Sequence, residues 1–191
     1  MNKTSSSRRA LLASMAAAGL PLSTPSAQAQ AATEKRRLRY AFPVAETGFD
    51  TVKISDLYSR TVTSNIFEAM YRYDHLTRPV QVRPLTAVDL PEVSNEFRSF
   101  KIRIRPGILF ADDPAFKGKP RELVAQDYVY SLQRFADPAT KSVTWGSIEE
   151  SKIVGLNALR KQHMADKKPW NYDREVPGLR ALDRYTLQID L

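Results

Sequence analysis

Two short segments in which apolar and polar residues alternate strictly constrain the fold more than any other feature of the sequence. In residues 100–105, Phe100, Ile102 and Ile104 alternate with three cations, and in residues 185–191 four apolar residues alternate with polar ones. Because successive side chains of a strand point to opposite faces, each segment predicts a strand with one buried face, as in antiparallel sheets. The second strand reaches the end of the sequence without a turn, which favours a truncated chain with an unpaired terminal edge.

Three segments with helical periodicity predict amphipathic helices. Apolar residues recur every three or four positions in residues 56–71, where Asp56 is the expected N-cap. Residues 125–136 carry a second apolar stripe that includes Leu132, and Asp137-Pro138 ends it. A third, shorter pattern covers residues 153–164. Helices and strands together predict an α/β protein.

The remaining segments predict a first strand, a hairpin and two loops. Residues 38–42 are basic and apolar and end at Pro43, which is typical of a strand. A short hairpin is expected at residues 73–84, and loops are expected at residues 111–122 and 167–177, where prolines and polar residues cluster.

The first 29 residues predict a secretory signal peptide rather than part of the fold. Lys3, Arg8 and Arg9 precede an apolar run over residues 10–22, and Ala27-Gln28-Ala29 supplies the small residues that a signal peptidase reads. The apolar run is too short for a membrane anchor. Residues 7–12 also resemble the twin-arginine export motif, so both export routes stay open. The alternative is a disordered Ala/Ser tail.

Composition excludes several kinds of functional site. The chain has no cysteine, which rules out disulfides, thiolate metal sites, a catalytic cysteine and a lipid-modified N-terminal cysteine. It has two histidines, His75 and His163, so a histidine-rich metal site is also excluded. No phosphate-binding loop, nucleophile elbow or metal motif is present, and no catalytic residue, metal or cofactor is expected.

Two functional classes remain open on these grounds. A secreted hydrolase with a serine triad would need His75 or His163 as its base, and neither lies in a recognisable motif. A protein that binds nucleic acid or another anionic surface is suggested by the net charge of +8. Three of those charges leave with the signal peptide, and no nucleic-acid recognition motif accompanies the rest.

Five segments, in order along the chain, resemble the family 5 extracellular solute-binding proteins, which are the peptide-binding receptors of ABC importers. Residues 65–74 (NIFEAMYRYD) resemble the family's helix-to-strand segment. The others are RPLTA, the strand Phe100–Arg105 with its Pro-Gly turn, AQDYVYSLQR and ALDRYTLQIDL. Departures occur at Asp89-Leu90-Pro91, where the family's usual Trp is missing, and at residues 110–114, which replace its "FHDG" turn. These departures indicate a divergent subfamily.

The resemblance implies the N-terminal part of a two-lobed, type II periplasmic-binding-protein fold, with a mixed sheet and flanking helices. Residues 30–191 would form about the N-terminal third of such a protein, truncated before the second lobe. The implied function is capture of peptides or a similar small solute in the periplasm for an inner-membrane ABC permease. The protein would be no enzyme, would be monomeric at full length and would bind no nucleic acid.

The resemblance also implies where the ligand binds. The family's first loop before a helix bears an acidic residue and reaches the cleft, and here it is the loop of residues 45–50. The expected ligand-binding residues are Glu46, Thr47 and Phe49. Glu46 would accept a hydrogen bond or face a ligand cation, and Phe49 would pack under the loop. The alternative is an ordinary turn with a solvated Glu46.

Overall fold

The computed structural model describes residues 39–191, so the predicted signal peptide lies outside the described residues. Residues 41–191 form one compact unit, which contains all the described helices and strands. No helix in the described part is long and apolar enough to cross a membrane.

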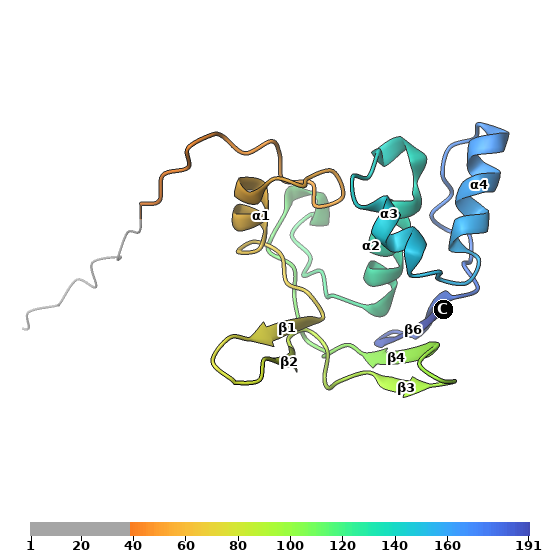
Figure 1. Cartoon of the computed structure of the whole chain (residues 1–191), viewed down its shortest axis with the longest axis horizontal. Coiled ribbons are helices and arrows are strands. Elements are labelled where there is room, and N and C mark those ends of the chain that lie inside the picture. The colour runs from red at the N-terminus through yellow and green to blue at the C-terminus, as the bar shows by residue number, and fades with distance from the viewer. Residues whose placement is uncertain (1–38) are drawn as a thin grey trace, which may run out of the picture. The chain divides into compact units, whose positions relative to one another are not determined.

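A four-stranded sheet forms the base of this unit (Figure 1). Its order is β3 (Glu92–Ser94), β4 (Ser99–Arg103), β6 (Thr186–Asp190), β5 (Leu179–Asp183). Both alternating segments are strands, and they pair with each other through Ile102 and Leu187. Within residues 39–191 every strand pair is antiparallel, so the parallel strands of a mixed sheet do not occur there.

The last strand corrects one expectation from the sequence. We expected an unpaired edge at residues 185–191, but β6 is an inner strand with β4 on one side and β5 on the other. β5 was not predicted because apolar and polar residues alternate only weakly in it. Its pairing with β6 is interrupted by a bulge between Ala181 and Asp183. The edge strands of this sheet are β3 and β5.

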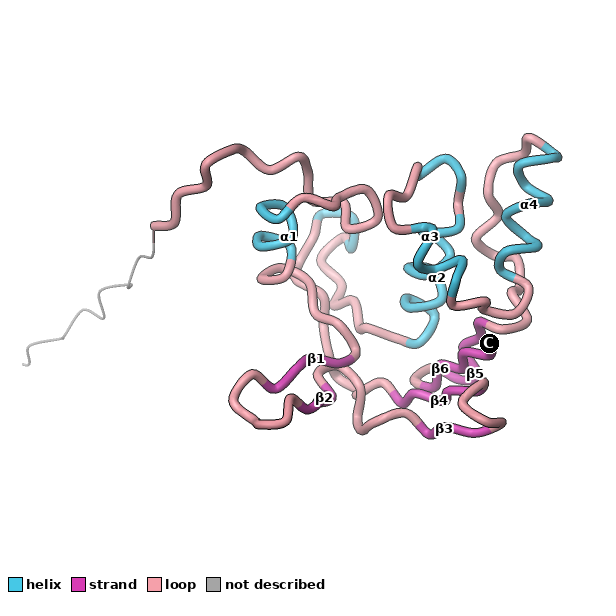
Figure 2. The backbone as a smooth tube through the Cα atoms, viewed as in Figure 1, coloured by secondary structure: helices cyan, strands magenta, loops and turns pink. Residues whose placement is uncertain are grey.

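The predicted hairpin is a separate two-stranded sheet, β1 (Tyr71–Asp74) and β2 (Gln81–Pro84). Figure 2 shows it extending to one side of the four-stranded sheet. The turn that joins its strands contains Leu76, which is 94% exposed.

Four α-helices lie above the sheet or beside it in Figure 1, and two short 3₁₀ turns lie in the loops. Their bounds are α1 (Leu57–Thr63), α2 (Ala125–Ala136), α3 (Trp145–Glu150), α4 (Leu156–Asp166), η1 (Pro114–Phe116) and η2 (Pro138–Thr140). Helix α2 has the predicted bounds and packs on β5 and β6. Its most buried residues are Ala125, Val129, Gln133 and Ala136, whereas Leu132 is half-buried.

The hydrophobic core lies between α2, α4 and the sheet. Ile102 of β4, Ile104 directly after β4 and Leu187 of β6 meet Val129 of α2 and Leu156 of α4. All five are buried. The two alternating segments therefore supply the strand side of the core, as their pattern predicts.

Helix α1 is shorter than predicted, and the first strand is absent. α1 ends at Thr63 because Ser64 Oγ and Asn65 Nδ2 both donate to the carbonyl of Thr61, at 3.1 and 2.7 Å, and replace continued helical hydrogen bonds. Residues 39–42 pair with no strand of the described chain. Pro43, which follows them, has no N–H with which to join a sheet.

Helix α4 begins later than predicted, and α3 was not expected. Gly155 has φ +82°, a left-handed conformation that cannot lie inside a helix, so α4 starts after it at Leu156. α3 contains Trp145 and Gly146, both poor helix formers, and it has only six residues.

Candidate functional site

Thr47 is the one expected ligand-binding residue that the structure ties into a hydrogen-bond network. Its backbone N–H donates to Ser59 Oγ at 2.9 Å, and its hydroxyl donates to Asp56 Oδ2 at 2.5 Å. The loop before α1 is therefore fixed to the first turn of that helix.

Asp56 is the N-cap that the sequence predicts. Its Oδ1 accepts from the backbone N–H of Ser59 at 2.8 Å while its Oδ2 accepts from Thr47. The Ser59 amide and the Thr47 hydroxyl stabilise the charged form and lower the pKa of Asp56 to about 2. The carboxylate is thus ionised at neutral pH.

Asp50 fixes the other end of the loop to helix α2. Its Oδ2 forms an ion pair of 2.8 Å with Arg134 and lies 4.0 Å from Lys53 Nζ. Partial burial alone would raise the pKa of Asp50, but the hydrogen bonds from Arg134 and the Val52 amide outweigh it and the pKa is lowered. The loop of residues 45–50 is thus held at both ends, by α1 and by α2.

Glu46 and Phe49 take no part in this network. Glu46 is exposed and has no side-chain hydrogen bond or ion pair with the described residues. Phe49 is 48% exposed, so about half of this residue is covered by its neighbours. The structure therefore presents Glu46 and half of the Phe49 ring to solvent beside the anchored Thr47.

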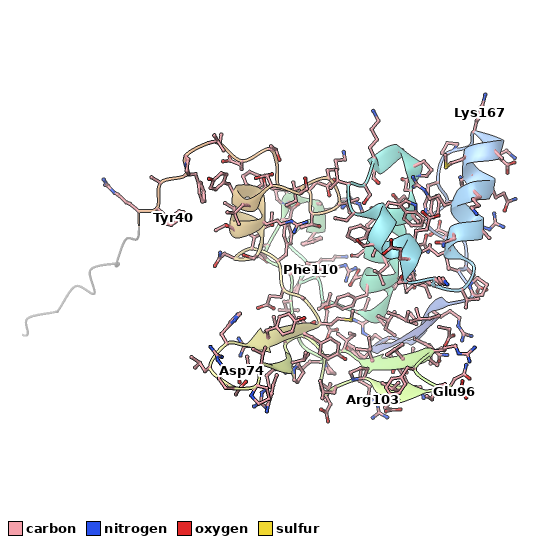
Figure 3. The ribbon with its side chains drawn as sticks, viewed as in Figure 1. Tyr40, Asp74, Glu96, Arg103, Phe110 and Lys167 are labelled. Carbon is pink, nitrogen blue, oxygen red and sulfur yellow. The ribbon has the colours of Figure 1, made fainter. Side chains whose placement is uncertain are left out.

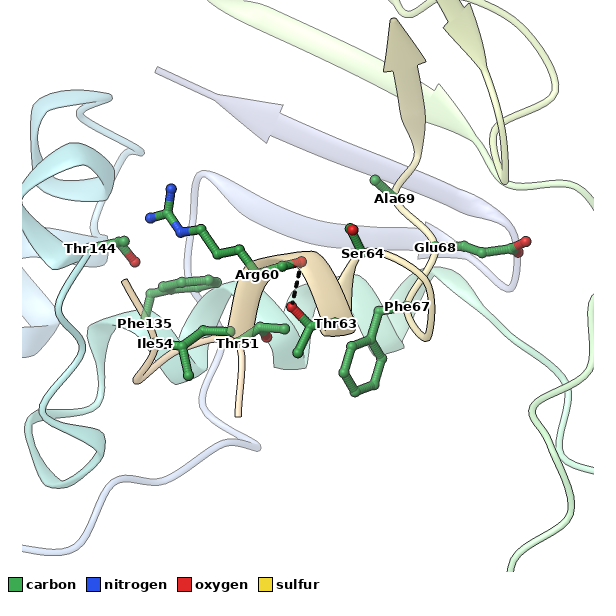
Figure 4. Close-up of a pocket in the computed structure, with 10 residues that line it drawn as sticks. All are labelled: Thr51, Ile54, Arg60, Thr63, Ser64, Phe67, Glu68, Ala69, Phe135 and Thr144. Atoms are coloured by element: carbon green, nitrogen blue, oxygen red, sulfur yellow. Dashed lines mark hydrogen bonds between the residues drawn. The ribbon is translucent and has the colours of Figure 1, made fainter. Parts of the chain in front are cut away.

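An open pocket of about 430 Å³ begins where this loop ends. Thr51 and Ile54 line it directly after the loop, α1 and the segment after it supply one wall, and α2 supplies Phe135. Figure 4 shows the rings of Phe67 and Phe135 at two sides of the pocket and the hydrogen bond from Thr63 Oγ1 to the Arg60 carbonyl, 3.3 Å long.

The pocket combines apolar surface with opposite charges. Ile54, Phe67 and Phe135 are apolar, and Arg60 and Glu68 contribute a cation and an anion. No ion pair within residues 39–191 involves Arg60 or Glu68. Both charges are available to a ligand that carries charges of its own.

The sequence did not predict this pocket because its walls come from distant segments. Residues 51–69 meet Phe135 and Thr144 only in the folded chain. Two signals were nevertheless present in the sequence: α1 has a single charged residue, Arg60, and the large apolar residues Ile66 and Phe67 follow it. In the structure the side chains of Ile66 and Phe67 are each more than half exposed.

A second cavity, of about 570 Å³, adjoins Glu122 and Arg184. The Glu122 carboxylate already accepts hydrogen bonds from Arg184 at 2.7 Å, the Gly107 amide at 2.7 Å and the Tyr185 hydroxyl at 3.0 Å. These donors, Arg184 first, lower the pKa of Glu122 to about 2. The cluster joins the β5–β6 turn to the loop before α2, which is a structural role.

Neither of the two histidines lines one of these pockets. His75 is exposed in the β1–β2 turn. His163 stacks on Trp170 with a centroid distance of 4.7 Å, and its Nδ1 lies 3.2 Å from the Lys168 carbonyl. In the described part of the chain, neither histidine contacts a serine hydroxyl and a carboxylate together. The described residues also contain no cluster of His, Asp and Glu that could hold a metal ion.

The chain is similar in sequence and in structure to peptide-binding proteins. The periplasmic oligopeptide-binding protein OppA of Salmonella typhimurium is 27% identical over 142 residues, which are 74% of this chain and 22% of OppA. The Escherichia coli murein tripeptide binding protein MppA is 27% identical over 76% of this chain and 25% of its own, with a TM-score of 0.55. These matches confirm the resemblance to the family 5 solute-binding proteins.

Further structures agree on the fold. Haemophilus influenzae OppA, solved with the peptide RPPGFSPFR, superposes with a TM-score of 0.57 at 20% identity over 76% of this chain and 25% of its own. The α/β, type II periplasmic-binding-protein fold class is confirmed. No protein-family model matches the chain.

The matched part of the chain spans about a quarter of the length of these family 5 relatives. The matched proteins are binding proteins by name, and the curated relative is periplasmic. None of the comparisons bears on Glu46, Thr47 and Phe49, which stay predictions.

Proposed function

We propose that the chain is the N-terminal portion of the peptide-binding component of an ABC importer, that it works in the periplasm, and that it is not an enzyme. The observation that carries this proposal is the 27% identity to a periplasmic oligopeptide-binding protein over 142 residues, on the same fold. The bound peptide would pass to an inner-membrane permease.

The anchored loop and the pocket beside it form the proposed half-site on this lobe. Thr47 is held by Ser59 and Asp56, and Asp50 is held by Arg134, so the loop meets a ligand with little loss of conformational entropy. Glu46, free of partners among the described residues, would pair with a ligand cation such as an N-terminal amine or a lysine side chain.

The pocket supplies the complementary contacts in this proposal. Arg60 would pair with a ligand carboxylate, and Phe67 and Phe135 would pack on an apolar side chain. A peptide carries both charges and apolar groups on one extended backbone. Strand-like hydrogen bonds to that backbone would let the pocket accept peptides of different sequence.

One lobe alone would bind weakly. The pocket is open to water, so each hydrogen bond to a peptide nets only about 0.5–1.5 kcal/mol, against an association cost of about 4 kcal/mol or more. In two-lobed receptors, hinge closure removes water from the ligand. We therefore expect useful affinity in the protein made from its complete reading frame, and much weaker binding by residues 30–191.

A thermal-shift screen with di- to pentapeptides tests this function. The protein from the complete reading frame should be stabilised by at least one peptide, and mass spectrometry should recover that peptide uncleaved after incubation. A peptide that is hydrolysed would overturn the non-enzymatic role, and a screen without any stabilising peptide would overturn the peptide-binding role.

A further inference from the structure

The hairpin β1–β2 places two arginines directly opposite each other on one face. Arg72 pairs in register with Arg83, and Tyr73 pairs with Val82 on the other face. Like charges opposite each other destabilise a strand pair unless an anion lies between them. Figure 3 labels Asp74, the single carboxylate of this hairpin.

That one carboxylate does not neutralise the hairpin. Asp74 Oδ2 lies 3.4 Å from Arg83 Nε, and its Oδ1 accepts from the Leu76 amide at 3.0 Å. Arg72 takes part in no ion pair within residues 39–191. Arg78 donates only to the carbonyls of His75 and Thr77, both at 2.8 Å, so its charge is also uncompensated.

In the neighbouring four-stranded sheet, cations on β4 are paired with a carboxylate. On β4, Lys101 and Arg103 both pair with Glu92 of β3, at 3.7 and 3.2 Å. Arginines without an ion-pair partner are thus a feature of the hairpin and not of every exposed strand in this basic chain.

Apolar groups are also exposed on this hairpin, in its turn and on the face opposite Arg72 and Arg83. Leu76 in the turn is 94% exposed, and Tyr73, Val80 and Val82 are each close to half exposed or more. An exposed leucine in the turn, close in sequence to Arg78, fits the boundary between lipid headgroups and acyl chains.

We propose that the hairpin β1–β2 docks on an anionic membrane surface, with Leu76 in the headgroup layer and Arg72, Arg78 and Arg83 on lipid phosphates. The unpaired arginines of the hairpin are complementary in charge to lipid phosphates, and membrane attraction adds up residue by residue, at about 1 kcal/mol for each cation near an anionic surface. The docking would hold the protein at the membrane without a lipid anchor.

A fluorophore placed at the hairpin tip tests this proposal. Because the chain has no cysteine, L76C gives a single labelling site for an environment-sensitive dye on the full 191-residue chain. The control label is K119C, an exposed position in the loop after η1. Reading the local environment separates the hairpin from any vesicle binding by residues 1–29.

Vesicles of equal parts phosphatidylcholine and phosphatidylglycerol should raise the L76C emission about twofold with a blue shift, and about 0.5 M NaCl should abolish the rise. Pure phosphatidylcholine vesicles should leave it unchanged. R72E/R83E should remove the response, R72Q/R83Q should reduce it, and K117E/K119E should retain it.

Three results would overturn the docking proposal. The first is no response of the L76C label to phosphatidylglycerol, and the second is an equal response at K119C. The third is a response that is as large as that of the unsubstituted arginines in a folded R72E/R83E or R72Q/R83Q variant, with folding checked by circular dichroism. None of these results bears on peptide binding, which uses other residues.

Discussion

Asp50 Oδ2 and a guanidinium nitrogen of Arg134 lie 2.8 Å apart, across 84 residues of sequence. This ion pair holds the candidate ligand loop against helix α2. Both side chains are about one third exposed, so the pair is neither fully solvated nor fully buried.

A double-mutant cycle with Asp50→Asn and Arg134→Gln should give a coupling energy of about 0.5–1 kcal/mol at neutral pH, the upper range for exposed pairs. The pKa of Asp50 is lowered in the folded protein, so the stabilisation is fully present above its ordinary value of 3.8. It is lost as the pH falls through the lowered value. Urea denaturation at several pH values measures this, and a coupling that rises on acidification would contradict the ion pair.

The centre of the sheet should tolerate truncation poorly. Leu187 in β6 is fully buried between β4 and β5, so Leu187→Ala should cost about 2–5 kcal/mol of unfolding free energy. Leu76→Ala is the matched control, since this leucine is 94% exposed, and it should stay within about 0.5 kcal/mol. Equal losses in urea denaturation would mean that β6 is not the inner strand described.

Among the described glycines, Gly178 is the one at which an added Cβ would come closest to other atoms. A Cβ there would lie 2.5 Å from the Val154 amide nitrogen and 2.6 Å from the Asp190 carbonyl oxygen, both backbone atoms. Gly178→Ala should therefore destabilise the protein by about 1–3 kcal/mol. Gly146→Ala, in α3 with no atom within 4 Å, should be neutral or stabilising. Thermal melts compare the two, and a neutral Gly178→Ala would contradict this packing.

Residues 1–29 should be absent from exported protein. Mass spectrometry of exported material is expected to show Gln30 as the first residue, and an intact Met1 would contradict the signal peptide. Replacing Arg8 and Arg9 with lysine separates the two export routes, because only the twin-arginine route should be blocked.

Local features of the sequence predicted local features of the fold. Asp56 is the N-cap of α1, and Asp137-Pro138 ends α2 at Ala136, because caps and prolines act within one turn. The strict alternation at residues 100–105 likewise gave β4 and its buried face.

Features that depend on distant partners were not predictable in the same way. β5 has little alternation and is a strand because β6 lies beside it, and residues 39–42 alternate no worse but pair with no strand of the described chain. The pocket needs Phe135 beside residues 51–69, a contact that no local pattern encodes. Of the predicted site residues, Thr47 lies in a network formed by α1, while Glu46 and Phe49 are exposed.

The loop and pocket of this lobe are proposed to hold a peptide. Isothermal titration calorimetry tests this claim most directly, with a stabilising peptide and the protein from the complete reading frame. Arg60→Gln should weaken binding about tenfold, as expected when a charge-assisted hydrogen bond is lost, and Lys117→Gln should leave it unchanged. Equal affinity of wild type and Arg60→Gln, or no saturable binding of any peptide, would contradict the claim.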